Sequence, residues 1–428
     1  MNSQNGFAFY GANKNRQQVT FKFINNLIVI PLKINGKELS FILDTGVNKT
    51  ILFNLSKNDS LGLKNIEKVK LQGLGDGKPV EALLSKNNVL TLKNIMSGNE
   101  SIYVILKDHF DFSGKMGITI HGIIGHSLLK NVIAKINYKS KKIDFYNPKT
   151  FAYPKCRKCE TFPIQFYRKK PYIDIQVQLD TLGNKMTDVK MLIDSGGSDA
   201  IWLFEGTKDE IKTPKRFFND ILGEGLSGTI YGNRSRIPKI SIKEFDLIRP
   251  TVSFLDTISS FNARKFKQRN GSIGGNILSR FKVWIDYPNR KLTLKKNGSF
   301  KGGFNYNMSG LEVVYDGKQL VREQNQKIFR DGFNNQADRK NSISFVTSYF
   351  YKFKPSYRIN KVVSNSPAFK AGLLKNDILL KINGKASHQF ELEDIIYKFQ
   401  EKDRKKIKLL IERKGEKIKF EFYLEKRV

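Results

Sequence analysis

Short apolar runs separated by turn signals dominate the first two thirds of the chain. The stretch "NLIVIPLKINGKELSFILD" (residues 26–44) has two apolar runs joined by "NGKE", which predicts a β-hairpin. "YIDIQVQLD" (172–180) alternates apolar and polar positions, as a half-exposed strand does. We expect only short helices here, at "GHSLLKNV" (125–132) and "GNILSRF" (275–281), each opening after a glycine. The pattern therefore predicts a mainly β fold.

The same pattern occurs twice. Asp-Thr-Gly at 44–46 returns as Asp-Ser-Gly at 194–196, and "LQGLG" at 71–75 returns as "ILGEG" at 221–225, both 150 residues later. The segment "IIGHSLLKNVIAKINYKSKKIDF" is followed in the second copy by "SIGGNILSRFKVWIDYPNRKLTL" in nearly the same register. Three landmarks in one order indicate an internal duplication. The predicted domains are a first lobe at 1–154, a second at 155–304 and a third domain at 305–428.

Each copy places a carboxylate at the end of an apolar strand, in "FILDTGVNKTILF" and "MLIDSGGSDAIWLF". Carboxylates are rarely buried unless they are paired or functional. If the copies face each other, Asp44 and Asp194 meet and share one proton, because two like charges about 3 Å apart cannot both ionise. One carboxylate then takes a proton from a water that attacks a peptide carbonyl, and its partner donates to the oxyanion. An Asx-turn explains either loop alone, but it does not require both copies to agree.

The residues beside the acids suit the same task. Gly46 and Gly196 leave the backbone room for a tight turn. Thr45 and Ser195 keep a hydroxyl in both copies, and we expect these hydroxyls to make hydrogen bonds across the two lobes that hold the loops rigid.

On these motifs, the first two lobes resemble the retropepsin-like and two-lobed pepsin-like aspartic peptidases. Ile123-Ile124-Gly125 and Ser272-Ile273-Gly274 are similar to the family's second signature, with a serine in place of one apolar residue. The resemblance implies that Asp44 and Asp194 are the catalytic pair and that substrate lies extended under two flaps. The flap candidates are Gly73, Leu74 and Gly75 in the first copy and Gly223, Glu224 and Gly225 in the second. Val47 and Gly197 depart from the family pattern after the motif glycine, so specificity does not carry over.

The C-terminal third has a different pattern. "YRINKVVSNSPAFKAGLLKNDILLKINGKA" resembles a bacterial PDZ domain, with Asn376 in place of a usual glycine. Asparagine tolerates the left-handed conformation, so the turn can persist. "ELEDIIYKFQEK" predicts an amphipathic helix and "KIKLLIERKGEKIKFEFYL" a closing hairpin. The resemblance implies a groove for a peptide C-terminus, with Ser309, Gly310 and Leu311 as candidates for the loop that binds its carboxylate. A PDZ fold that binds nothing is the alternative.

Composition adds little to this interpretation. Among 428 residues, 75 Lys+Arg face 40 Asp+Glu, a net charge of +35. The basic residues are spread over the chain and no nucleic-acid motif accompanies them, so no specific nucleic-acid partner is predicted. Cys156 and Cys159 lack the further ligands of a zinc site and are interpreted as an incidental pair or a local disulfide. We expect no metal, no cofactor and no transmembrane segment.

The sequence therefore predicts an aspartic endopeptidase that cleaves extended polypeptide and carries a PDZ domain for substrate recruitment. Two motifs in one chain remove the need for a homodimer, so a monomer is expected. The combination resembles bacterial retropepsin-like proteases with a C-terminal PDZ domain, which are generally exported to the cell envelope. One alternative is a silent protease-like protein that binds peptides or acts as a scaffold, and another is a basic nucleic-acid-binding protein.

Overall fold

The structure is a computed structural model that describes residues 6–11, 14–55, 61–71, 79–106, 112–180, 183–225, 228–330 and 343–428. It is built mainly from strands with a few short helices, which confirms the predicted fold class. The chain forms two compact units. Unit 1 comprises Met1–Tyr306 and Lys426–Val428, and unit 2 comprises Asn307–Glu425. The last three residues therefore belong with unit 1 rather than with the domain predicted at 305–428.

The first lobe of unit 1 contains a nine-stranded sheet with the order β1-β9-β6-β10-β5-β4-β8-β7, and β3 pairs with β4. Its strands are β1 (Ala8–Phe9), β3 (Lys22–Ile24), β4 (Leu27–Ile34), β5 (Lys37–Leu43), β6 (Thr50–Leu52), β7 (Ile66–Leu71), β8 (Val80–Leu92), β9 (Ile95–Val104) and β10 (Gly122–Ile124). The predicted hairpin is present: β4 and β5 pair antiparallel around Asn35 and Gly36, which both have positive φ.

The second lobe repeats this arrangement in a ten-stranded sheet with the order β18-β19-β22-β17-β23-β16-β15-β20-β21, and β14 pairs with β15. Its strands are β14 (Gln165–Tyr167), β15 (Lys170–Gln178), β16 (Met186–Ile193), β17 (Ile201–Phe204), β18 (Phe218–Gly225), β19 (Gly228–Arg236), β20 (Lys239–Ile242), β21 (Phe245–Ile248), β22 (Thr251–Leu255) and β23 (Arg269–Ile273). In each lobe the strand that ends at the motif Asp runs parallel to a later strand: β5 to β10, and β16 to β23.

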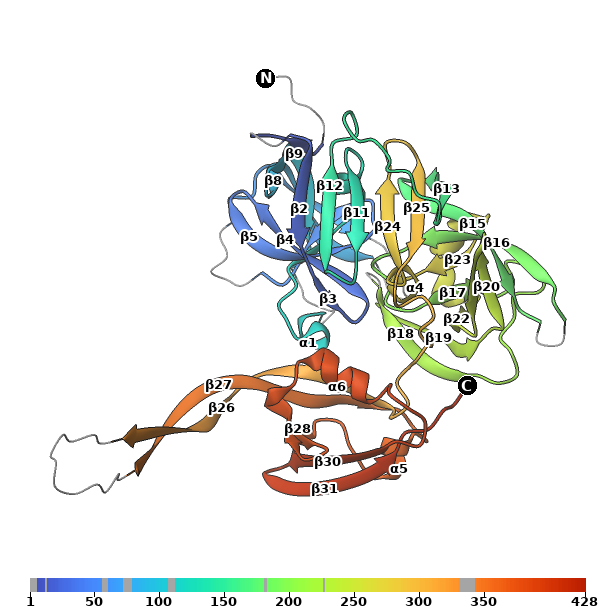
Figure 1. Cartoon of the computed structure of the whole chain (residues 1–428). Coiled ribbons are helices and arrows are strands. Elements are labelled where there is room, and N and C mark those ends of the chain that lie inside the picture. Colours follow the sequence, from blue (N-terminus) through green and yellow to red (C-terminus); the bar gives the residue numbers. More distant parts are fainter. Residues whose placement is uncertain are drawn as a thin grey trace. The chain divides into compact units, whose positions relative to one another are not determined.

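A third sheet joins the lobes. Its six strands have the order β13-β25-β24-β11-β12-β2, three from each lobe, and Figure 1 shows them side by side. They are β2 (Arg16–Thr20), β11 (Ile133–Asn137), β12 (Lys142–Tyr146), β13 (Cys159–Pro163), β24 (Phe281–Asp286) and β25 (Lys291–Lys296). At the centre β11 pairs antiparallel with β24, and one buried apolar core continues through both lobes. A disulfide joins Cys156 to Cys159 just before β13.

The helices of unit 1 are short. They are α1 (Phe112–Met116), α2 (His126–Leu129), α3 (Thr257–Ser260), the 3-10 turn η1 (Ala263–Lys265) and α4 (Gly275–Leu278). The helices predicted at the two glycines are α2 and α4, each confined to one turn. None of the helices in the described ranges has the length and apolar character needed to span a membrane.

Unit 2 is a six-stranded sheet with the order β26-β27-β28-β30-β31, and β29 pairs with β28. Its elements are β26 (Leu311–Arg330), β27 (Ile343–Val362), α5 (Pro367–Lys370), β28 (Ile378–Ile382), β29 (Lys385–Ala386), η2 (Ser387–Gln389), α6 (Leu392–Lys398), β30 (Lys406–Arg413) and β31 (Glu416–Tyr423). The predicted helix corresponds to α6 and the predicted closing hairpin to β30–β31. Asn376 has a φ of 74°, which confirms its left-handed turn.

Residues at the end of the chain pack on the second lobe. The hydroxyl of Tyr306 accepts hydrogen bonds from the N–H groups of Arg427 (2.6 Å) and Val428 (2.9 Å). The Arg427 guanidinium lies over the ring of Phe218, the first residue of β18. Arg236 donates to the carbonyl of Val428 at 3.3 Å. The terminal residues therefore contact the base of the β18–β19 hairpin.

Candidate active site

The two motif acids stand at equivalent points of the two lobes. Asp44 directly follows β5 and Asp194 directly follows β16. The N–H of Asp44 donates to Ile124 O at 2.8 Å, and the N–H of Asp194 donates to Ile273 O at 2.9 Å. These bonds attach each loop to the parallel strand beside it. A Cβ on Gly125 would collide with the Asp44 carbonyl, so glycine is required where that strand ends.

Thr45 and Ser195 bind the two loops to each other, as the sequence leads us to expect. Thr45 Oγ1 donates to Ile193 O at 2.6 Å and accepts from the N–H of Ser195 at 2.9 Å. Ser195 Oγ donates to Leu43 O at 2.7 Å and accepts from the N–H of Thr45 at 3.1 Å. Both side chains are buried, so the four bonds form without competition from water.

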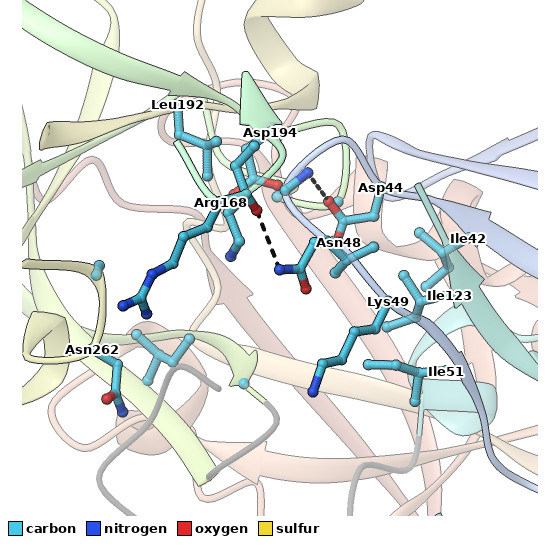
Figure 2. A pocket seen from close by; sticks show the side chains of 18 of the residues that line it. Ile42, Asp44, Asn48, Lys49, Ile51, Ile123, Arg168, Leu192, Asp194 and Asn262 are labelled. Atoms are coloured by element: carbon cyan, nitrogen blue, oxygen red, sulfur yellow. Dashed lines mark hydrogen bonds between the residues drawn. The ribbon is translucent and has the colours of Figure 1, made fainter. Parts of the chain in front are cut away.

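The structure places the carboxyl groups of Asp44 and Asp194 next to each other. They approach each other from facing loops (Figure 2). The N–H of Gly46 donates to Asp44 Oδ1 at 2.6 Å. A Cβ on Gly46 would lie 3.0 Å from an oxygen of each acid, and a Cβ on Gly196 would overlap the Asp44 carboxyl group. The two motif glycines are therefore needed for the acids to meet.

The surroundings of Asp44 raise the pKa of its carboxyl group. Burial, and then the negative charge of Asp194, raise the pKa of Asp44 from its ordinary 3.8 to about 8. The Gly46 N–H and the positive charge of Lys170 act in the opposite direction. At neutral pH the Asp44 carboxyl group is therefore protonated, the state in which it can donate a proton.

The pair opens into a cavity of about 510 Å³, a size typical of a ligand site. Apolar side chains from both lobes form most of its wall: Leu27, Ile42, Ile51, Phe53, Leu71, Phe112 and Ile123 from the first lobe, and Tyr167, Tyr172, Leu192, Trp202, Ile230 and Phe266 from the second. Figure 2 shows Ile42, Ile51 and Ile123 on the side of Asp44. An extended polypeptide with apolar side chains fits such a wall.

One predicted flap lies within the described residues. Gly223, Glu224 and Gly225 belong to β18, which forms a hairpin with β19. Gly225 and Ile230 of this hairpin line the cavity. The other flap candidates, Gly73, Leu74 and Gly75, lie outside the described residues.

In the predicted carboxylate-binding loop of unit 2, the main-chain N–H groups donate hydrogen bonds to side chains of the same loop. The N–H groups of Ser309 and Gly310 donate to Asn307 Oδ1 at 3.0 and 3.3 Å. The N–H of Leu311 donates to Ser309 Oγ at 3.0 Å. The three donors expected for a peptide carboxylate therefore already have partners in this structure.

Sequence reasoning missed a group of cations at the cavity. Lys170 and Arg269 lie beside the acids, and Lys49, Arg168 and Lys265 also line the cavity. The run "YRKKPY" (residues 167–172) does not indicate a binding site by itself, because a run of charged residues normally lies on a solvated surface. The fold instead brings one of these lysines inward.

Comparisons with known proteins address the two units separately. Residues 30–128 match the aspartyl protease family model, and residues 358–413 match the PDZ domain model. No curated protein matches the chain. Among solved structures, the aspartic proteinase from Irpex lacteus is similar at 12% identity and a TM-score of 0.44, over 67% of this chain and 99% of that one. Residues 30–128 thus belong to an aspartyl protease domain and residues 358–413 to a PDZ domain.

Proposed function

We propose that unit 1 is an aspartic endopeptidase whose catalytic pair is Asp44 and Asp194. The observation that carries the proposal is the close approach of these two partly buried carboxyl groups, which line one cavity. A pair with one proton supplies a base and an acid within reach of one water. The match of the first lobe to the aspartyl protease family supports the same reaction class.

The reaction balances with the groups present. The ionised carboxylate takes a proton from water, and the water oxygen bonds to the peptide carbonyl carbon. The protonated carboxyl group gives its proton to the carbonyl oxygen, which forms a neutral gem-diol. The C–N bond then breaks: the protonated carboxyl group gives its proton to the leaving amine, and the ionised partner takes a proton from one hydroxyl of the gem-diol, which leaves a carboxylic acid product. The pair returns to its starting state with one shared proton.

Cleavage of an unfolded protein tests the assignment. We expect cleavage by the wild type and about a hundredfold or greater loss in Asp44→Asn and in Asp194→Asn, because each substitution removes one proton-transfer partner. Asp246→Asn is the matched control, since Asp246 lies on β21 and pairs with Lys239 at the surface. A transition-state mimic of the pepstatin type should inhibit and a chelator should not. Comparable activity in either variant of the pair would refute the assignment, and peptide binding without cleavage would support the silent protease-like alternative.

We also propose that unit 2 recruits peptides by strand addition along β26. This strand lies at one edge of its sheet, and α6 packs against it. An outer strand offers unpaired main-chain groups to an extended peptide. Because the amides of Ser309, Gly310 and Leu311 already have partners, we expect a free and an amidated peptide C-terminus to bind the full chain with similar affinity. Loss of binding on amidation would show instead that the loop rearranges to hold a carboxylate.

A further inference from the structure

Lys170 places an ammonium group in the wall of the cavity. It is the first residue of β15, it is half-buried, and it lines the cavity next to the acids. Its Nζ makes no hydrogen bond and no ion pair with any residue in the described part of the chain. Burial lowers the pKa of Lys170, and the charges of Asp44 and Asp194 raise it. Burying a cation in this way is costly unless an anion compensates it.

The Asp pair compensates only part of the local positive charge. Arg269 is fully buried beside Lys170, and its guanidinium donates to Gly271 O at 3.1 Å and to Ser272 Oγ at 2.7 Å. Those partners are neutral. Two cations therefore face a pair of acids that shares one proton and carries one negative charge. The floor of the cavity is left with an excess of one positive charge.

The charged side chains in the rest of the cavity wall are also positive. Lys49, Arg168 and Lys265 line the cavity further out. Among the lining residues that the structure describes, Asp44 and Asp194 are the only acids. An anionic group that enters the cavity therefore meets attraction from several sides, and water is partly excluded there, which strengthens the attraction.

The internal duplication provides a comparison for Lys170. In the first lobe, β3 and β4 are joined by two residues with positive φ, and Leu27 follows as the first residue of β4. In the second lobe, β14 and β15 are joined in the same way, and Lys170 follows. Both residues line the cavity. The position accepts an apolar side chain in one lobe, so the fold itself does not require the lysine in the other.

We propose that Lys170 forms a subsite for an Asp or Glu side chain of the substrate close to the bond that is cleaved, so that the cavity selects acidic polypeptide segments. This inference rests on the proposed function, because it names the substrate class of the same site. The substrate carboxylate would pair with the Lys170 ammonium and neutralise the excess charge described above. Charge-assisted pairs of this kind discriminate strongly when one partner is already desolvated.

Matched peptides test the proposal. One cleavable sequence is prepared with Glu or with its neutral isostere Gln at each position that flanks the cleaved bond, and kcat/KM is measured for each peptide. For the wild type we expect Glu to exceed Gln about tenfold or more at one position, the size expected for a hydrogen bond to a charged group. Lys170→Met should remove this ratio and Lys170→Arg should retain it. Lys185→Met is the control, since Lys185 pairs with Glu210 at the surface of the same lobe and should leave the ratio unchanged.

The ratio of kcat/KM for the Glu peptide to that for the Gln peptide tests the Lys170 subsite separately from the proposal that the protein is a peptidase. A change in the Asp pair caused by Lys170→Met affects both peptides and cancels in the ratio. Cleavage without a preference for Glu, or a preference that survives in Lys170→Met, overturns the subsite and leaves the peptidase intact. If the wild type cleaves nothing, equilibrium binding of the same peptides decides. Tighter binding of the Glu peptide that is lost in Lys170→Met supports the subsite, and equal binding overturns it.

Discussion

Thr45 and Ser195 make four hydrogen bonds across the boundary between the two lobes, two to each other and two from their hydroxyls to main-chain carbonyls of the opposite lobe. Neither side chain touches the cavity, yet together they fix where the two acids meet. The relationship is reciprocal, because each hydroxyl donates to the residue before the other lobe's Asp. Such a contact suits a site that must hold two carboxyl groups against their mutual repulsion.

Thr45→Val should weaken this contact. The substitution keeps the shape and removes the hydroxyl, which leaves Ile193 O and the N–H of Ser195 buried without that partner. We expect the free energy of unfolding to fall by about 1–3 kcal/mol and activity to fall with it. Urea unfolding and kcat/KM are the measurements. Thr45→Ser retains the hydroxyl and should stay close to the wild type, so equal stability of the Val and Ser variants would contradict this account.

Gly196→Ala and Gly197→Ala form a matched pair. A Cβ on Gly196 would overlap the Asp44 carboxyl group, whereas a Cβ on Gly197 would lie 3.5 Å from Asp194 Cγ, an ordinary contact. We expect Gly196→Ala to reduce kcat about a hundredfold or more, because a displacement of about 1 Å at reacting groups costs that much. Gly197→Ala should have a small effect. Similar losses in both variants would show that the loop tolerates no side chain at either position.

The titration of Asp44 should appear in the stability of the protein. Its pKa is about 8 in the folded chain against an ordinary 3.8, so the folded state holds a proton that the unfolded state has released between these values. The stabilisation is complete below about pH 4 and is lost as the pH rises through about 8. Urea unfolding at several pH values, with Asp44→Asn as the reference, isolates this contribution. The wild type should lose stability relative to the variant as the pH rises, and the opposite slope would contradict the assigned shift.

The pH dependence of activity should change when Lys170 is replaced. Because the pair needs its shared proton, kcat/KM for a neutral peptide should fall as the pH passes the pKa of Asp44, about 8. The positive charge of Lys170 lowers that pKa, so Lys170→Met should move the alkaline limb to higher pH. Lys170→Arg keeps the charge and should keep the wild-type profile. A limb that moves to lower pH in the Met variant would contradict the assignment.

The elements that depend on local chemistry were predictable from the sequence. Asn35-Gly36 predicts its turn because few residues accept positive φ, and Asn376 replaces glycine for the same reason. The repeat of Asp with a hydroxyl residue and glycine predicts that Asp44 and Asp194 lie together, because only a shared task requires two distant loops to agree.

Features that depend on packing between distant segments were not predictable. Lys170 lies at the position of Leu27, but the segments between these positions and the two acids differ in length, so the fixed spacing of the repeat does not align them. The length of β26 was not predictable either, because the strand continues through a polar segment only by pairing with β27 over a long register. The N–H of Ser309 donates to the side chain of Asn307, and the PDZ-like sequence motif gives no indication of this local hydrogen bond.

The place where the polypeptide returns to unit 1 matters for anyone who wishes to study that unit alone. A chain cut after Tyr306 lacks Arg427 and Val428, and it leaves the tyrosine hydroxyl and Arg236 without those partners at the foot of the β18–β19 hairpin. Excising residues 307–425 and bridging the gap with a flexible linker keeps the final tripeptide. The internal deletion, rather than the simple truncation, is therefore the fragment in which that hairpin retains its native support.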